Sequence, residues 1–197
     1  VVAVAGLLLK RRPKVSSSIP SQRPEVDQDN PLTLQAALQD SHWQVRLEAV
    51  QGISAQHSAE NLSLLLSMFS DVDSDVHEAA AAGVERYGSD ALDGLHHVLN
   101  TGNLNARETA IQSLWRLHDP HSTPALINAL LHDESAWVRS PAAQALGRLG
   151  DDEALHALIQ SLSDTHPDVK QAVRAALAQI GTPEALAALS VDGLEAD

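Results

Sequence analysis

The sequence has no cysteine and few aromatic residues, and each absence excludes a class of site. Without cysteine the chain forms no disulfide, has no thiolate nucleophile and offers no sulfur ligand to zinc or iron–sulfur clusters. The aromatic residues are Trp43, Phe69, Tyr87, Trp115 and Trp137. A platform on which nucleic-acid bases stack needs several clustered rings, so five scattered ones argue against it.

Basic residues are also scarce, because 13 Lys and Arg face 26 Asp and Glu, which gives a net charge of −13. Residues 1–30 carry five basic and three acidic side chains, which leaves −15 on residues 31–197. A body this acidic repels phosphate backbones, so we expect no nucleic-acid partner. Its surface is either simply solvated or suited to basic partner surfaces.

The first 30 residues differ in kind from the rest. Residues 1–9 are apolar, and the basic segment 10–14 follows at once. A bilayer crossing takes about 20 apolar residues, but this order is typical of the cytoplasmic end of a membrane helix. We therefore interpret residues 1–14 as the end of a membrane anchor whose start is missing. Residues 15–30, rich in Ser and Pro, are predicted to be a flexible linker, and residues 31–197 the folded body.

A repeat of about 31 residues runs through this body. Its anchor is a turn position held by Asp40, Asp71, Thr101, Asp133 and Asp164, at spacings of 31, 30, 32 and 31 residues. Apolar residues recur 5, 9 and 13 positions after each anchor, as in the buried stripe of a helix. The stripe consists of Val45, Ala49 and Ile53; Val76, Ala80 and Val84; Ala106, Ala110 and Leu114; Val138, Ala142 and Leu146; and Val169, Val173 and Leu177.

A second apolar stripe lies upstream of each anchor, so every unit is predicted to contain two helices. Thr123–Pro124 and Thr182–Pro183 each place a capping hydroxyl before a first-turn proline. Gly88, Gly150 and Gly181 stand where second helices should end in a left-handed cap. One helix pair cannot bury its stripe alone, so neighbours must stack. We predict an all-α fold, an α-solenoid wound as a right-handed superhelix of about five helix pairs plus a terminal capping helix.

The pattern Asp-x4-Val-Arg-x2-Ala-x3-Leu-x3-Gly of residues 133–150 resembles HEAT repeats of the short type named after the phycobilisome lyases. The resemblance covers residues 31–189. Pro141 departs from the pattern and should bend the second helix or delay its start. The resemblance implies a structural ladder between turn Asp and helix Arg residues, here Asp40, Asp71, Asp133 and Asp164 with Arg46, Arg107, Arg139 and Lys170.

Ten histidines raise the question of a metal site. The segment from His118 to His121 supplies two imidazoles and one carboxylate, whereas a zinc site needs three or four converging ligands. His132 lies a whole helix away, about 12 Å at ~1.5 Å per residue, so we expect it at the opposite edge. His77-Glu78 resembles the dipeptides that bind di-iron in HEAT-repeat hydroxylases, but one unit of five carries it. We predict no metal, no cofactor and no catalytic residue.

The exposed side of the second helices is the predicted partner-binding surface. Positions 8, 11 and 15 after each anchor share a helix face opposite the buried stripe. At position 15 three successive units carry arginine, a basic stripe that could dock an acidic segment of a partner. Solvated arginines, or arginines paired with local carboxylates, are the alternative. A tryptophan near a helix start is a further candidate, with packing between turns as its alternative. The candidate residues are Arg86, Arg116, Arg148, Gln112, Gln144 and Trp137.

Taken together, these features favour a non-enzymatic scaffold that binds a protein partner on the concave helix face. We expect it to be tethered to a membrane on the cytoplasmic side, as an accessory subunit or assembly factor of a membrane complex. Two alternatives stay open. The family resemblance implies a bilin-lyase-like subunit that acts on an antenna protein, since such lyases often act as paired subunits. A soluble cytoplasmic HEAT adaptor is the other.

Overall fold

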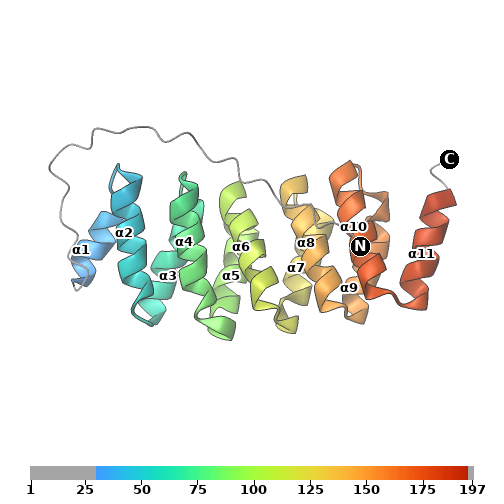
Figure 1. The fold of residues 1–197 in the computed structure, drawn as a ribbon, viewed down its shortest axis with the longest axis horizontal. Helices are drawn as coiled ribbons and strands as arrows, with labels where there is room; N and C mark the ends of the chain where they lie inside the picture. Colours follow the sequence, from blue (N-terminus) through green and yellow to red (C-terminus); the bar gives the residue numbers. More distant parts are fainter. Residues whose placement is uncertain (1–29, 195–197) are drawn as a thin grey trace, which may run out of the picture.

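The computed structural model describes residues 30–194, which form eleven α-helices and four short 3-10 helices without a strand in that range (Figure 1). The expectations for residues 1–14 and for most of the linker lie outside the described residues. The α-helices are α1 (Pro31–Ala37), α2 (Trp43–Ser54), α3 (Ala59–Ser67), α4 (Ser74–Glu85), α5 (Leu92–Thr101), α6 (Leu104–Leu117), α7 (Thr123–His132), α8 (Ala136–Leu149), α9 (Asp152–Gln160), α10 (Pro167–Ile180) and α11 (Pro183–Leu194).

The helices form five consecutive pairs, from α1 with α2 to α9 with α10, and α11 closes the row. The second helix of each pair packs against the second helices of the neighbouring pairs, so α2, α4, α6, α8 and α10 make one layer of the molecule (Figure 1). The first helices make the other layer. The prediction of an α-solenoid with five pairs and a terminal helix is therefore confirmed, while the handedness of the superhelix stays a prediction.

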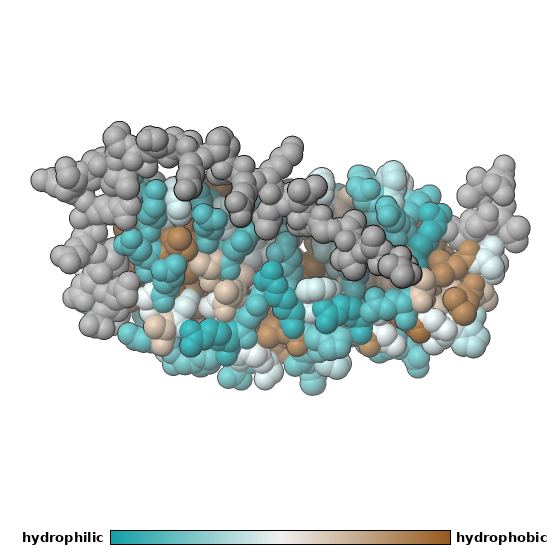
Figure 2. Space-filling model, viewed as in Figure 1, coloured by the Kyte–Doolittle hydropathy of each residue, from teal (hydrophilic) through white to brown (hydrophobic). Residues whose placement is uncertain are grey.

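The core lies between the two layers. Every residue of the stripe at positions 5, 9 and 13 is at most 4% exposed, which confirms the helical periodicity seen in the sequence. Small residues bring neighbouring helices close together: a Cβ atom added at Gly147 of α8 would lie 2.6 Å from the Cβ atom of Ala176 of α10. On the face shown in Figure 2, hydrophilic residues cover much of the second helices, and hydrophobic ones gather over α11.

The predicted left-handed caps are present at two of three helix ends. Gly150 and Gly181 follow α8 and α10 with φ of 68° and 65°. Gly88 is also left-handed, but α4 already ends at Glu85, and Gly88 begins a short 3-10 helix instead. In the third unit His118 takes the capping conformation, with φ of 52°. Histidine is among the non-glycine residues that tolerate this region.

Pro141 does not delay its helix. The helix α8 begins at Ala136 and runs through Pro141. The hydroxyl of Ser135 accepts a hydrogen bond from the backbone N–H of Trp137, and Val138 is fully buried in the core. A proline removes one backbone hydrogen bond, and this cap together with core packing holds the first turn in place.

The turn of the third unit is one residue shorter than expected. Thr101, the predicted anchor, still belongs to α5, and Gly102 takes the C-cap place that Asp133 holds after α7. A Cβ atom at Gly102 would lie 2.7 Å from the carbonyl oxygen of Val98 and 2.8 Å from the Cβ atom of Ala106. The tight turn therefore excludes a side chain, and with it an aspartate, from this place.

Candidate functional site

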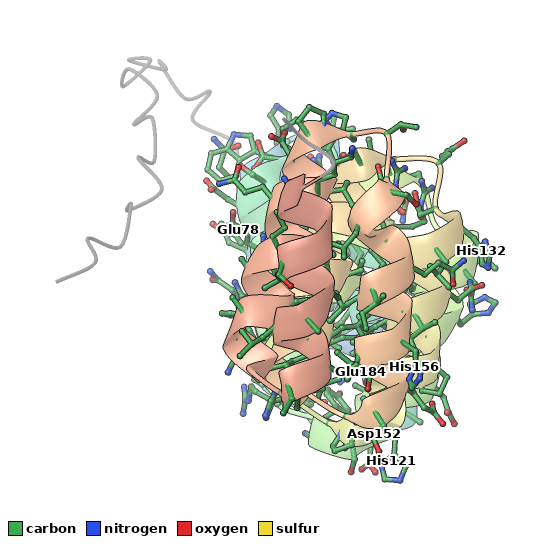
Figure 3. All side chains as sticks on the ribbon, turned by 90° about the vertical axis from the view of Figure 1, so that its right-hand side faces the viewer. Glu78, His121, His132, Asp152, His156 and Glu184 are labelled. Carbon is green, nitrogen blue, oxygen red and sulfur yellow. The ribbon has the colours of Figure 1, made fainter. Side chains whose placement is uncertain are left out.

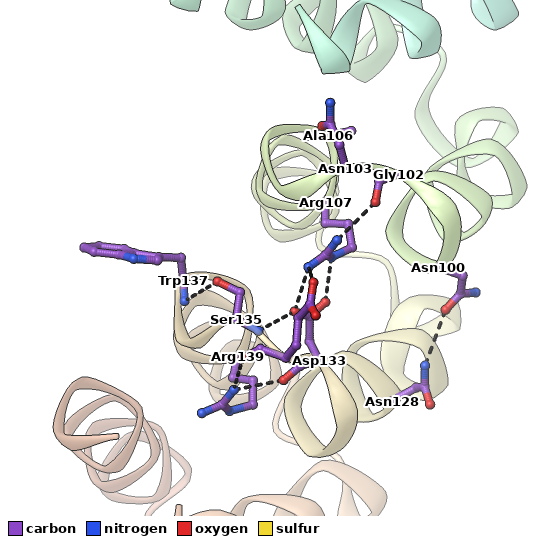
Figure 4. A network of polar contacts seen from close by, with 11 residues as sticks. Asn100, Gly102, Asn103, Ala106, Arg107, Asn128, Asp133, Ser135, Trp137 and Arg139 are labelled. Atoms are coloured by element: carbon purple, nitrogen blue, oxygen red, sulfur yellow. Dashed lines mark hydrogen bonds and ion pairs between the residues drawn. The ribbon is translucent and has the colours of Figure 1, made fainter. Parts of the chain in front are cut away.

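An Arg–Asp ladder joins neighbouring units where the second helices begin. Each guanidinium donates two hydrogen bonds to a carboxylate of the next unit and one or two to backbone carbonyls of its own turn. Figure 4 shows the rung between Arg107 and Asp133. The Nε–Oδ2 distances are 2.7 Å for Arg46–Asp71, 2.8 Å for Arg107–Asp133 and 2.8 Å for Arg139–Asp164. The same carboxylates accept a backbone N–H two residues on. Such bidentate pairs have fixed geometry, so these three rungs are structural, as the resemblance implies.

The ladder also sets the charge of its carboxylates. Hydrogen bonds from Arg139 lower the pKa of Asp164 below its ordinary value, against the opposing effect of burial. Burial raises the pKa of Asp71, but hydrogen bonds from Arg46 and from the backbone N–H of Asp73 outweigh it, and the net pKa is lowered. Groups held in the charged state in this way are poor candidates for proton transfer near neutral pH.

Two predicted ladder residues do not form rungs in the part of the chain that the structure describes. Asp40 stands in the first unit and pairs with His42, whose Nδ1 lies 3.0 Å from Oδ1. Lys170 lies in the last helix pair, and within residues 30–194 no following unit supplies an aspartate to pair with it. A rung is also absent between the second and third units, where His77 takes the Arg position and Gly102 the Asp position. His77 Nδ1 instead lies 3.2 Å from the backbone oxygen of Asp71.

The histidines do not converge on a common site. His121 lies at one end of α7 and His132 at the other, as expected from the sequence (Figure 3). Glu78 projects from the opposite side of the molecule from His132 (Figure 3). Within residues 30–194, no three His, Asp or Glu side chains gather closely enough to hold a metal ion.

The arginine stripe makes contacts between units. Each arginine reaches back to the C-terminal end of the preceding second helix. Arg86 Nη1 donates to the carbonyl oxygen of Ser54 at 2.8 Å. Arg116 Nη1 donates to Glu85 Oε1 at 2.8 Å. The guanidinium carbon of Arg148 lies 4.2 Å from the centre of the Trp115 ring. The stripe thus forms a second set of joints between units.

Three other predicted residues line one groove. Gln112, Trp137 and Gln144 meet across α6 and α8, and α10 closes the groove, which has a volume of about 260 Å³. Its other lining residues are Glu108, Ala136, Ser140, Pro141, His166 and Asp168. Trp137 is 71% exposed, and its indole ring points away from the ladder (Figure 4). The alternative that Trp137 packs between turns is therefore wrong.

Glu108 and Asp168 give the groove its charge. Partial burial raises the pKa of Glu108, with smaller opposing effects of His77 and Arg107. Asp168 Oδ2 lies 3.8 Å from His166 Nδ1. Sequence reasoning missed both carboxylates because it followed positions 8, 11 and 15 alone. Positions 4 and 7 after the anchor fall on the same side of the second helix, and this spacing could have identified them.

The comparisons with known proteins decide the family. The family model for HEAT repeats matches residues 30–115 and 123–191. The chain belongs to the HEAT-repeat family. Its helix pairs are thus those of a HEAT solenoid, and the resemblance drawn from the sequence is confirmed.

This HEAT protein is also similar to individual known proteins. It is 34% identical over 91 residues to the bilin biosynthesis protein PecE of Mastigocladus laminosus, a match that covers 46% of this chain. The chain spans about a third of the length of that relative, 34%. The solved complex of CpcE and CpcF of phycocyanin lyase from Nostoc sp. PCC7120 is similar in fold. Its TM-score is 0.61 at 21% identity, and the match covers 70% of this chain and 89% of that one.

The HEAT body contains no candidate membrane span. Among the eleven described helices, none combines the length and the apolar character that a bilayer crossing requires.

Proposed function

We propose that this HEAT protein is a protein-binding scaffold that holds a partner on the face formed by α6, α8 and α10. The observation that carries the proposal is the exposed side chain of Trp137 beside the groove between α6, α8 and α10. Tryptophan is enriched among the few residues that dominate binding energy at protein interfaces. Gln112 and Gln144 flank it with donors and acceptors that suit a polar rim.

The comparisons support this proposal. A protein of similar fold was solved as a complex of two proteins, CpcE and CpcF. Solenoids of stacked repeats offer extended surfaces on which partners bind. Membership of the HEAT family therefore agrees with a role in assembly.

Affinity capture with a matched pair of variants tests the scaffold. The wild-type protein and Trp43→Ala should retain the natural partner equally, because Trp43 lies outside the groove. Trp137→Ala combined with Gln144→Ala should reduce its recovery about 30-fold, as expected for a hot spot worth about 2 kcal/mol. Equal recovery with both variants would show that the groove face binds no partner.

A second candidate function is a bilin-lyase-like subunit, and the likeness to PecE favours it. In this role the protein would act with another subunit in attaching or removing a bilin on an antenna protein. The test is to mix the protein with bilin and antenna apoprotein, with and without candidate partner subunits. A visible absorbance band of a bound bilin is expected if it acts as a lyase subunit, and unchanged spectra throughout would count against it.

We also propose that residues 1–14 tether the scaffold to a membrane at its cytoplasmic side. Their support is the apolar-then-basic order of the sequence, which is typical of that end of a membrane helix. Fractionation of the natural full-length protein should recover it with membranes after alkaline washing. Recovery in the soluble fraction alone would exclude the tether and leave a soluble adaptor.

A further inference from the structure

The groove beside Trp137 combines an exposed aromatic ring with negative charge. Its lining residues include the carboxylates of Glu108 and Asp168, and among the described residues that line it there is neither Lys nor Arg. The face continues this charge into the preceding unit, where Asp75 and Glu78 are exposed on α4. An aromatic face attracts a cation, and a nearby carboxylate adds to that attraction.

Glu108 is the carboxylate that would gain most from a bound cation. It is partly buried, and it has no hydrogen bond or salt bridge among residues 30–194, although its neighbour Arg107 is paired with Asp133. The attraction of His77 and Arg107 offsets its burial only in part, so the pKa of Glu108 is raised. A carboxylate that has lost part of its hydration without gaining a hydrogen bond is destabilised. A cation that enters the groove would supply the missing partner.

The molecule already uses this chemistry within its own chain. On the same layer of second helices, Arg148 stacks over Trp115 and Arg116 pairs with Glu85. Both are contacts of an arginine with the unit before it. The Trp137 groove offers the same two kinds of acceptor, an indole face and a carboxylate, with no arginine of the described chain lining it.

From this geometry we infer that the groove binds an arginine side chain from an extended basic segment of the protein partner. The guanidinium stacks on Trp137 and pairs with Glu108 and Asp168. Arginine fits better than lysine because its planar group stacks and donates in a fixed fork. Helices pack about 8–10 Å apart and an extended chain advances about 3.3 Å per residue, so a basic residue about every third position matches successive units.

This inference rests on the proposed scaffold function. It gives the partner segment the charge opposite to the one that the arginine stripe suggested, in agreement with the basic partner surfaces that the acidic body suits. The arginine stripe suggested an acidic partner. In the structure those arginines contact Ser54, Glu85 and Trp115 of neighbouring units, and the exposed groove carries the opposite sign. The partner segment is therefore expected to be basic.

Titration of the full chain with defined peptides tests the inference. The probe is a fluorescently labelled nonapeptide with arginine at every third position among serines, and its control carries citrulline, which has the same shape without the charge. Fluorescence polarisation should show binding of the arginine peptide, weaker at high salt, and at least tenfold weaker binding of the citrulline peptide. Trp137→Ala should weaken binding about tenfold and Glu108→Gln about three- to tenfold.

Two control variants separate the groove from the acidic body as a whole. Glu153→Gln removes the same charge from an exposed position on α9, and Trp43→Ala removes a ring outside the groove. Both should bind within twofold of the wild type. Equal weakening by Glu153→Gln and Glu108→Gln would overturn the inference, because attraction would then be non-specific. Equal binding of the citrulline peptide would also overturn it.

Two further outcomes identify other occupants. If the peptide binds only after the basic residues of segment 10–14 are replaced by glutamine, this chain's own segment fills the groove and the inference is overturned. The natural partner could also be captured through Trp137 while the arginine peptide neither binds nor competes with it. This result would support the scaffold function and overturn the inference of a basic partner segment. Competition by the arginine peptide for the captured partner would support both.

Discussion

At the residue scale, the contribution of each charged pair between units to stability depends on how far its side chains are buried. Arg139 and Asp164 are 13% and 11% exposed, whereas Arg116 on the opposite end of the second helices is 48% exposed. Removal of one partner from a buried pair leaves the other charge buried and unpaired. This costs more stability than the intact pair contributes. An exposed pair exchanges its partner for water at little loss.

A double-mutant cycle on Arg139 and Asp164 checks this difference. Each single change to alanine should lower the free energy of unfolding by about 2–3 kcal/mol, with a coupling of about 1.5–3 kcal/mol between them. The same cycle on Arg116 and Glu85 should give a coupling below about 1 kcal/mol. Urea denaturation followed by circular dichroism measures both, and equal couplings would contradict the argument from burial.

At the element scale, the helices α8 and α10 approach at a point where no side chain fits. A Cβ atom at Gly147 would lie 2.7 Å from the Cα atom of Ala176 as well as 2.6 Å from its Cβ atom. Backbone atoms cannot turn aside as a flexible side chain can, so any added methyl group must push the two helices apart. Tight interiors resist such changes.

Gly147→Ala should therefore destabilise the protein, although alanine favours a helix by about 1 kcal/mol over glycine. We expect a net loss of about 1–2 kcal/mol in the free energy of unfolding, because overpacking typically costs about 1–3 kcal/mol. Gln144→Ala on the same helix is the control, since that side chain is exposed and should change stability by less than about 0.5 kcal/mol. If the Gly147→Ala variant were more stable than the wild type, the helix propensity of alanine would outweigh the steric clash between α8 and α10.

At the scale of the whole molecule, the ladder links stability to pH. The pKa values of Asp71 and Asp164 are lowered in the folded state from an ordinary 3.8. Their ionised forms therefore stabilise the fold at a pH above that value, and this contribution is lost as pH falls through the folded-state pKa. Because each rung joins two units, acid should weaken several joints of the solenoid together.

We expect these carboxylates to leave the free energy of unfolding unchanged between pH 7 and about 5, and to lower it below about pH 4. Asp164→Asn should be less stable than the wild type at pH 7, and the gap should narrow as pH falls towards 3. Urea denaturation at several pH values measures the difference. A gap independent of pH would show that Asp164 contributes through packing rather than charge.

Much of the candidate site was visible in the sequence, and the rest needed neighbours from other units. Helical spacing placed Gln112 and Gln144 on one face, and Trp137 was singled out by its place near a helix start. The structure brings all three to one groove. The arginine stripe was placed correctly, but its contacts could not be read, because Ser54, Glu85 and Trp115 each lie about 30 residues earlier in the chain. Helical periodicity shows which face of a helix a residue lies on, but it does not show which residue of a neighbouring unit contacts that face.

By itself the sequence determined the all-α solenoid and the buried stripe, because both follow from spacing within one short unit that is repeated. The Arg–Asp ladder was implied by the family resemblance, and three of its rungs are present. Only the tertiary structure decided how the second and third units join without a rung. At Gly102 the shortened turn leaves no room for a side chain, so the aspartate is excluded there and His77 bonds to its own turn instead. The tertiary structure also decided that the groove is negatively charged. Glu108 and Asp168 belong to different units and become neighbours of Trp137 only when the helices stack.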